Sequence, residues 1–237
     1  MSRLFLLCFL IMQFLAMDFV CGTCSAGNAR GSDGESSQDT IPDNQILYNG
    51  RSWHNLYTSV KDDRFLFSKE FLSGSVTMRG KTFSDIRIKY DIFKDEILTP
   101  DNQGGILQLN KEMVDSFSLL FRNKRYQFTR ITSDSLTGLG GYCNLLYNGR
   151  HALYVKYSKK IGKQADDGKF DKFYQINRTY LVKDSIPYPV SGKNDLLKLL
   201  STDKTSIRNF IKKNEITISK EDPESFIPVI RYLDTLR

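Results

Sequence analysis

Short stretches in which apolar and polar residues alternate occupy the chain from Ile46 to about Val190. In residues 86–92, single polar residues separate Ile, Ile, Tyr and Ile. Successive side chains of a β-strand point to opposite faces of a sheet, so this pattern predicts strands with one buried and one solvated face. The stretches follow one another at hairpin spacing, which predicts an antiparallel meander over residues 46–190.

Turn residues separate the predicted strands. Residues 79–81 (Arg-Gly-Lys), Asn123 and the pair Asn148-Gly149 each lie between two apolar runs. Asn-Gly favours a two-residue type I′ turn, because both central positions need a positive φ. The polar loop 132–141 divides the β domain into two halves.

A sheet with this many strands has to hide its apolar face. It can curl, close on itself or pack against another layer. We therefore expect a mainly β (α+β) fold in which the meander forms a curled sheet, an open barrel or a sandwich. The pattern does not distinguish these three arrangements.

In residues 191–237 the apolar period lengthens to three or four residues, which predicts a C-terminal helical segment packed on the β domain. Leu196–Leu200 give one short apolar helix, and Asp203 and Asp222 can each cap a further helix. A brief alternation at residues 216–218 predicts a short edge strand between the second and third helices.

The amino end has the three parts of a secretory signal peptide. Arg3 supplies the positive charge, residues 4–17 are apolar, and Cys24 and Ala26 place small residues at the −3 and −1 positions of a cleavage site. The apolar stretch is shorter than the ~20 residues that a transmembrane helix needs. We expect cleavage after residue 26 and export to the periplasm, the outer membrane or the exterior.

Cleavage there removes three of the four cysteines. Cys143 remains, and we interpret it as a small buried hydrophobe rather than a site of intermolecular chemistry. Cys24, which follows Cys21-Gly22-Thr23, is a candidate for lipidation as an alternative to plain cleavage. Residues 27–45 are rich in Gly, Ser, Asp and Asn, and we expect them to form a flexible linker.

No catalytic, nucleotide-binding or metal-binding motif is recognisable. His54 and His151 are the only histidines, and neither belongs to a His-x-His or His-Glu-x-x-His pattern. Residues 138–141 (Gly-Leu-Gly-Gly) lead into a hairpin, which predicts a connector rather than a phosphate loop. Counting from a two-residue hairpin turn places Cys143 opposite Tyr154, too far from His151 for a dyad. We expect no catalytic residue, metal or cofactor.

The net charge of +7 lies entirely in residues 150–237, which hold 18 Lys and Arg against 11 Asp and Glu. Lysines and aromatic residues interleave between residues 154 and 174. An exported protein meets anionic lipid headgroups and acidic glycans rather than nucleic acid. The alternative is a solvated basic face on ordinary strands. The expected binding residues are Lys156, Tyr157, Lys159, Lys160, Lys169 and Lys172.

Paired carboxylates are the one catalytic chemistry that the composition leaves open, because glycoside hydrolysis needs only two of them about 5–9 Å apart. Most of the candidates fall at predicted turns, where Asp commonly stabilises the backbone geometry. These candidates are Asp62, Asp63, Asp91, Asp95, Glu96 and Asp115.

Two segments resemble a known group of proteins. The first is Lys89-Tyr90-Asp91-Ile92-Phe93-Lys94-Asp95-Glu96, and the second runs from Asp195-Leu196-Leu197-Lys198-Leu199-Leu200 through Phe210-Ile211-Lys212-Lys213-Asn214. They look like those of uncharacterised exported proteins common in Bacteroidota, and the resemblance covers most of the chain after the linker. It implies a Gram-negative envelope or secreted setting and assigns no activity.

Together these observations favour a non-enzymatic envelope protein that binds a lipid, an acidic polymer or a protein partner, or that has a structural role. The alternative is a carboxylate-dependent hydrolase acting on an envelope or dietary polymer.

Overall fold

The structure is a computed structural model that describes residues 46–132, 138–163 and 171–236. The predicted signal peptide, cleavage site and linker lie outside these residues. All described residues belong to one compact unit, Thr40–Arg237.

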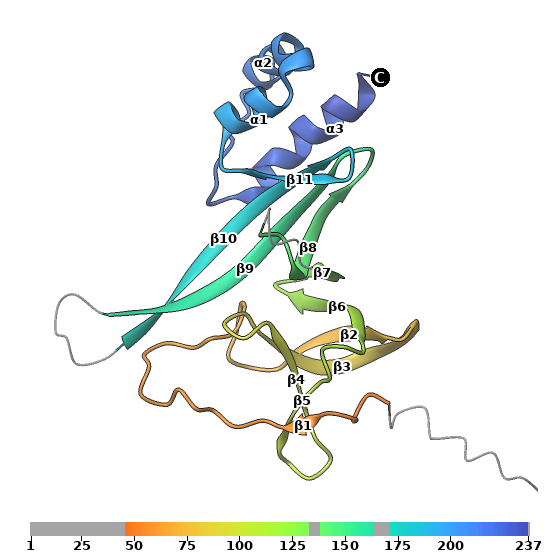
Figure 1. Ribbon diagram of the computed structural model, residues 1–237, viewed down its shortest axis with the longest axis vertical. Coiled ribbons are helices and arrows are strands. Elements are labelled where there is room, and N and C mark those ends of the chain that lie inside the picture. Colours follow the sequence, from red (N-terminus) through yellow and green to blue (C-terminus); the bar gives the residue numbers. More distant parts are fainter. Residues whose placement is uncertain (1–45, 133–137, 164–170, 237) are drawn as a thin grey trace, which may run out of the picture. The chain divides into compact units, whose positions relative to one another are not determined.

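Within the described residues, eleven antiparallel strands form one sheet in the order β1-β5-β4-β3-β2-β6-β7-β8-β9-β10-β11 (Figure 1). From β6 to β11, neighbours in the sheet are also neighbours in the chain, as in the predicted meander. The first half differs, because β2 pairs with β6 and β1 pairs with β5. The strands are β1 (Arg51–Ser52), β2 (Leu72–Met78), β3 (Lys81–Asp91), β4 (Glu96–Pro100), β5 (Ile106–Gln108), β6 (Val114–Phe121), β7 (Lys124–Ile131), β8 (Gly141–Asn148), β9 (Ala152–Lys163), β10 (Asp171–Lys183) and β11 (Ile186–Val190).

The sheet curls without closing, which is one of the three predicted arrangements. The backbone carbonyl of Ile92, just after β3, accepts a hydrogen bond from the amide of Lys159 on β9 at 3.1 Å. Lys61 forms an isolated bridge with Lys172 on β10. The curl therefore brings β9 against the turn after β3, and β10 against the chain that precedes β2.

An aromatic core fills the curl. Phe117 and Phe128 are cross-strand partners on β6 and β7, and their rings stack with centroids 4.6 Å apart. Tyr90 and Tyr142 meet the Phe117 ring edge-on at 5.0 and 5.1 Å. Such ring pairs contribute about 0.5–1.5 kcal/mol each beyond the burial of their area.

Three short helices near the C-terminus pack on the sheet, as predicted. They are α1 (Lys193–Leu199), α2 (Lys204–Lys213) and α3 (Ile227–Thr235). Their apolar residues form one cluster with Leu153 of β9 and Leu181 of β10. The predicted edge strand at residues 216–218 is wrong: these residues form no strand, and Ile216 and Ile218 pack against the helix cluster.

Two of the predicted tight turns are confirmed. Arg79 and Gly80 have φ values of 49° and 78° and connect β2 to β3. Asn123 forms the β6–β7 turn with Arg122, again with positive φ at both positions. Both pairs have the left-handed conformations of a type I′ turn.

The two-residue turn predicted at Asn148-Gly149 is wrong. Asn148 pairs with Ala152, so three residues form the turn, and the register shifts between Leu145 and Tyr147. The physical reason is tertiary: Asp234 of α3 accepts hydrogen bonds from the Tyr147 hydroxyl at 3.1 Å and from the amide of His151 at 3.4 Å. Docking on α3 overrides the local turn preference.

Candidate binding site

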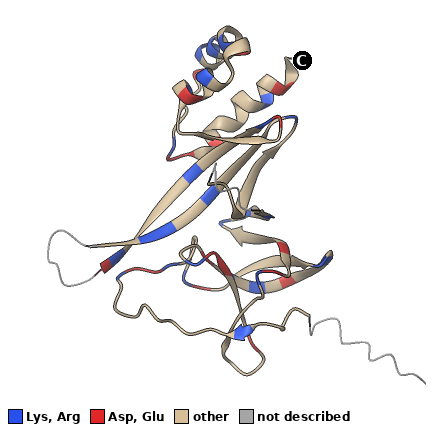
Figure 2. Ribbon diagram, in the orientation of Figure 1, with Lys and Arg blue, Asp and Glu red and all other residues tan. Residues whose placement is uncertain are grey.

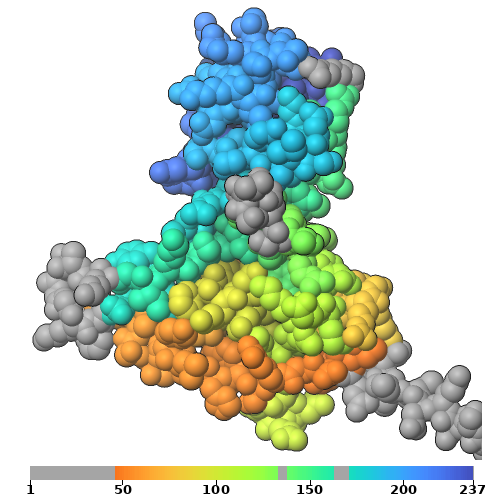
Figure 3. Space-filling view, viewed as in Figure 1, coloured from red at the N-terminus to blue at the C-terminus, as the bar shows by residue number. Residues whose placement is uncertain are grey.

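A cleft of about 450 Å³ lies beside β1 and the chain that follows it. We call it the aromatic–basic cleft. The orange segment of residues 50–60, which contributes much of the lining, lies at the molecular surface in Figure 3. The principal lining residues are Arg51, Trp53, Tyr57, Arg64, Lys94 and Glu96, and His54, Leu56 and Gln108 also contribute.

Arg64 is the buried cation of this cleft, with 5% of its surface exposed. Its Nε donates to Oδ2 of Asp91 at 2.5 Å, and its Nη2 lies 2.5 Å from the same oxygen. Its Nη1 is buried and has no hydrogen-bond partner, alone among the side-chain nitrogens and oxygens described. Buried polar atoms are normally paired, so Nη1 is an exception, and Arg64 is one of the residues that line the cleft.

Two aromatic rings flank the Arg64 guanidinium. Its Cζ lies 5.0 Å from the ring centroid of Trp53 and 5.2 Å from that of Tyr57. The Trp53 amide donates to the carbonyl of Ile106 at 2.8 Å, which anchors this part of the lining to β5. Cation–π contacts of this kind stabilise the rings in fixed positions beside the charge.

Asp91 orders both Arg64 and the turn that carries Lys94. Its Oδ1 accepts hydrogen bonds from the amides of Phe93 at 3.0 Å and Lys94 at 3.1 Å. Burial raises the pKa of Asp91 although the Arg64 guanidinium lies beside it. A buried pair of this kind is weak evidence for net stability, because desolvation offsets the attraction. Its evident effect is to fix Arg64 in the lining.

The rim of the cleft carries two exposed cations and one carboxylate. Arg51 donates from Nε to Oε1 of Gln108 at 2.8 Å, and its Nη2 lies 3.5 Å from Glu96. Lys94 has its Nζ 5.6 Å from the Tyr57 ring centroid. Burial, together with the charge of Asp91, raises the pKa of Glu96. The arrangement offers a ligand positive charge, ring faces and hydrogen-bonding groups.

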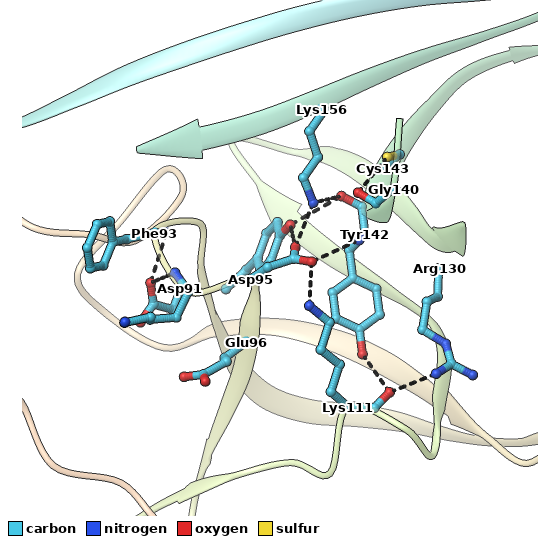
Figure 4. A network of polar contacts seen from close by, with 12 residues as sticks. Asp91, Phe93, Asp95, Glu96, Lys111, Arg130, Gly140, Tyr142, Cys143 and Lys156 are labelled. Carbon is cyan, nitrogen blue, oxygen red and sulfur yellow. Dashed lines mark hydrogen bonds and ion pairs between the residues drawn. The ribbon is translucent and has the colours of Figure 1, made fainter. Parts of the chain in front are cut away.

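A second polar cluster, the Asp95 network, lies between strands (Figure 4). The Asp95 carboxylate accepts hydrogen bonds from the hydroxyl of Tyr90 at 2.5 Å, from Lys111 at 2.7 Å and from Lys156 at 2.8 Å. Lys156 also donates to the carbonyl of Tyr142 at 3.1 Å. Burial opposes ionisation, but the charge of Lys156 and the hydrogen bonds hold the pKa of Asp95 below its ordinary value.

The residues expected to bind along β9 do not form one exposed surface. Alternation places Lys156 and Lys160 on one face of β9, and Tyr157 and Lys159 on the other. Lys156 belongs to the Asp95 network, and Tyr157 is 8% exposed in the aromatic core. Lys160 is exposed. Figure 2 shows the basic residues of β9 and β10 separated by uncharged ones.

The remaining lysines of this set have partners or lie elsewhere. Lys159 donates to Oδ1 of Asp63 at 3.1 Å and to the backbone carbonyl of the same residue at 2.7 Å. Lys172 lies 3.4 Å from Asp62. Lys169, like the lipidation candidate Cys24, falls outside the described residues.

Each of the six candidate carboxylates lies within 4.0 Å of a cation. Among those that line the aromatic–basic cleft, Glu96 is the one carboxylate present in the described residues. One carboxylate and several positively charged side chains therefore line the cleft. The pairs are Asp62–Lys172, Asp63–Lys159, Asp91–Arg64, Asp95–Lys111, Glu96–Arg51 and Asp115–Arg130.

The two histidines and Cys143 lie in different surroundings. His54 lines the cleft, whereas Nδ1 of His151 is 2.5 Å from Oδ1 of Asp234. Cys143 is fully buried in a cluster with Tyr180, and burial raises its pKa to about 11. A thiol with so high a pKa is a poor nucleophile near neutral pH.

No metal site or membrane-spanning helix emerges from the part of the chain that the structure describes. No three or more His, Cys, Asp or Glu side chains gather there as metal ligands. Its helices are too short or too polar to cross a membrane. No protein-family model matches the chain, and neither the curated proteins nor the solved structures contain a significant match.

Sequence reasoning missed the cleft because its lining comes from separate segments between residues 51 and 108. One local signal was present. The only Trp of the chain, Trp53, stands two residues after Arg51 and four before Tyr57. A lone Trp among basic and aromatic neighbours is typical of a binding surface.

Proposed function

We propose that the chain is a non-enzymatic, exported binding protein of the cell envelope that holds an acidic ligand in the aromatic–basic cleft. The observation that carries the proposal is the buried guanidinium of Arg64, which has an unpaired Nη1 and lies between Trp53 and Tyr57. The export signal predicted at residues 1–26 supports the envelope setting.

Charge and geometry favour an anion. Arg64, Arg51 and Lys94 bring three positive charges to the cleft, against the lining carboxylate of Glu96 and the buried carboxylate of Asp91 that binds Arg64, which leaves a net charge of +1. The rigid guanidinium fork matches a carboxylate or phosphate, and charge-assisted hydrogen bonds are stronger than neutral ones. An unpaired buried donor costs about 1–3 kcal/mol, and a ligand acceptor that reached Nη1 would recover that cost.

The carboxylate-dependent hydrolase remains the alternative. It requires a second acid within reach of Glu96. Asp91 is a candidate, because it is the cross-strand partner of Glu96 on β3 and β4. However, Asp91 is fully buried and hydrogen-bonded to Arg64. A binding role fits this lining better than two-carboxylate catalysis.

Trp53 provides a direct test, because the only Trp of the chain lines the cleft. We expect galacturonate to change the Trp fluorescence saturably, with a dissociation constant on the order of 1 mM. Galactose, which lacks the carboxylate, should bind more weakly, and added salt should weaken the binding of galacturonate.

Variants that remove single charges test whether the fluorescence response comes from binding in the cleft. Arg51→Gln and Lys94→Gln remove rim charges from exposed positions, and each should weaken galacturonate binding about threefold or more. Lys198→Gln removes one positive charge at an exposed position of α1 and should leave galacturonate binding unaltered. The proposal is wrong if neither galacturonate nor its linear oligomers give a saturable response, or if both rim variants bind like the wild type. Release of shortened products from polygalacturonate would favour the hydrolase instead.

A further inference from the structure

Two further hollows continue from the aromatic–basic cleft, one beyond the other. The second, of about 400 Å³, shares Arg51 and Gln108 with the cleft. The third, of about 550 Å³, shares Lys111 with the second and reaches Arg130 on β7. We infer that the three hollows form one groove for a linear acidic polysaccharide, an inference that rests on the proposed function of the cleft.

Two side-chain contacts mark the boundaries between neighbouring hollows. Arg51 on β1 lies opposite Gln108 on β5, and their side chains are hydrogen-bonded at 2.8 Å where the cleft meets the second hollow. Lys111, three residues after Gln108, stands between the second hollow and the third. Its Nζ is held by Asp95 at 2.7 Å (Figure 4), so this wall is fixed by the Asp95 network.

Cations line all three hollows, and two of these cations are shared between neighbouring hollows. Arg64 and Lys94 belong to the cleft, Arg51 to the cleft and the second hollow, and Lys111 to the second and third. Arg130 ends the series. Arg51, Arg64, Lys111 and Arg130 each lie within 4.0 Å of a protein carboxylate. A ligand whose negative charges recur along a chain can share or replace these contacts, and each additional contact then binds within the same molecule.

Arg130 is accessible at the far end of the groove. A third of its side chain is exposed. Its Nη1 donates to the carbonyl of Lys111 at 3.3 Å, and the carboxylates of Glu112 and Asp115 lie at 4.0 Å. Ion pairs as long as these are weak, so the guanidinium can turn to a ligand carboxylate.

The other lining groups favour a sugar polymer over polyphosphate. Glu96 and Asp115 only accept hydrogen bonds when ionised, and they need donors such as sugar hydroxyls, which polyphosphate lacks. Trp53 and Tyr57 offer flat, amphipathic rings at one end of the groove, which suit the apolar face of a pyranose ring. A uronic acid polymer supplies hydroxyls, ring faces and recurring carboxylates together.

The test compares galacturonate with its linear oligomers up to the hexamer, by Trp53 fluorescence on the full chain. A ligand confined to the cleft gains at most sixfold from six equivalent units. The groove predicts a larger gain, of about tenfold or more from monomer to hexamer. Arg130→Gln should lower the ratio of hexamer to monomer affinity about threefold, whereas Lys198→Gln should leave that ratio unchanged.

The outcomes separate the inference from the function on which it rests. Monomer binding with a hexamer gain of sixfold or less overturns the groove and leaves the proposed function standing. Absence of binding by monomer and hexamer alike overturns both. Hexamer binding without measurable monomer binding supports the groove. A polyphosphate of matched length that binds as tightly as the hexamer overturns the assignment to an acidic polysaccharide.

Discussion

Asp95 joins three segments that are distant in the sequence. Its carboxylate binds the Tyr90 hydroxyl on β3, Lys111 just before β6 and Lys156 on β9. Asp95 itself lies in the β3–β4 turn with φ of 60°. One side chain therefore connects the turn to the far side of the curl, and its charge state bears on stability.

We expect Asp95→Asn to lower the free energy of unfolding by about 2–4 kcal/mol at pH 7, because two partly buried ammonium groups lose their counter-charge. The pKa of Asp95 is lower in the folded than in the unfolded protein, so its contribution is complete above 3.8 and is lost as the pH falls through that value and below. Urea unfolding at pH 7 and near pH 2 should show a smaller difference in the free energy of unfolding between wild type and variant at the lower pH.

Asp62→Asn is the matched control. Asp62 pairs with Lys172 at 3.4 Å, and both side chains are about half exposed. Exposed pairs contribute about 0–1 kcal/mol, so this variant should unfold almost like the wild type. A loss in Asp62→Asn equal to that in Asp95→Asn, or a gap for Asp95→Asn that does not narrow in acid, would contradict the role given to the Asp95 network.

Single lysines also show why the site was harder to predict than the fold. The sequence shows that lysines and aromatic residues interleave in residues 154–174. Lys156 and Lys159, however, bind Asp95 and Asp63, which lie 61 and 96 positions away in the sequence. Whether a lysine is free to bind a ligand depends on such distant partners. No local pattern contains that information.

At the scale of elements, the sequence predicts a turn well when its backbone needs are met locally. Gly80 and Asn123 tolerate the positive φ values of these two turns, and Arg79 and Arg122 adopt positive φ values beside them. The β8–β9 turn was mispredicted because Asp234, 83 positions after His151, bonds the end of that hairpin. Alternation likewise predicts that β3 has a buried face, but not that β2 pairs with β6 across the break in the meander.

Gly141 at the start of β8 is constrained both by its local backbone conformation and by side chains distant in the sequence. It has φ of 69°, and a Cβ there would clash with Oδ2 of Asp95 and lie 2.9 Å from Nζ of Lys156. Gly80 has a similar φ of 78° but open space around it. The two glycines therefore differ in packing while they share the same backbone conformation.

We expect Gly80→Ala to cost about 1 kcal/mol and Gly141→Ala about 3 kcal/mol or more. The first change carries only the strain of a left-handed alanine, and the second also displaces the Asp95 carboxylate from Lys156. Urea denaturation of both variants measures the difference. Equal losses would mean that Asp95 and Lys156 accommodate the methyl group, and that the network does not constrain the start of β8.

At the scale of the whole folded unit, β9 connects two apolar clusters. Leu153 belongs to the cluster of the C-terminal helices, whereas Val155 and Tyr157, on the same face of the strand, belong to the aromatic core. The sequence predicts the sheet from its hairpin spacing and the C-terminal helices from their apolar period. That one strand, β9, joins the helix cluster to the aromatic core depends on tertiary packing. This connection makes the helices part of the unit that forms the cleft.

Ile230→Ala tests that union from the helix side. Ile230 is fully buried in the helix cluster, and its truncation should cost about 2–4 kcal/mol through lost burial and the cavity left behind. Since β9 carries both clusters, Trp53 fluorescence beside β1 and far-UV circular dichroism should report the same shifted transition. Arg208→Ala, on the exposed side of α2, should change stability by about 0.5 kcal/mol or less. If circular dichroism shows an early loss of helix while the Trp53 transition stays at the wild-type midpoint, the helices unfold separately and the cleft does not depend on them.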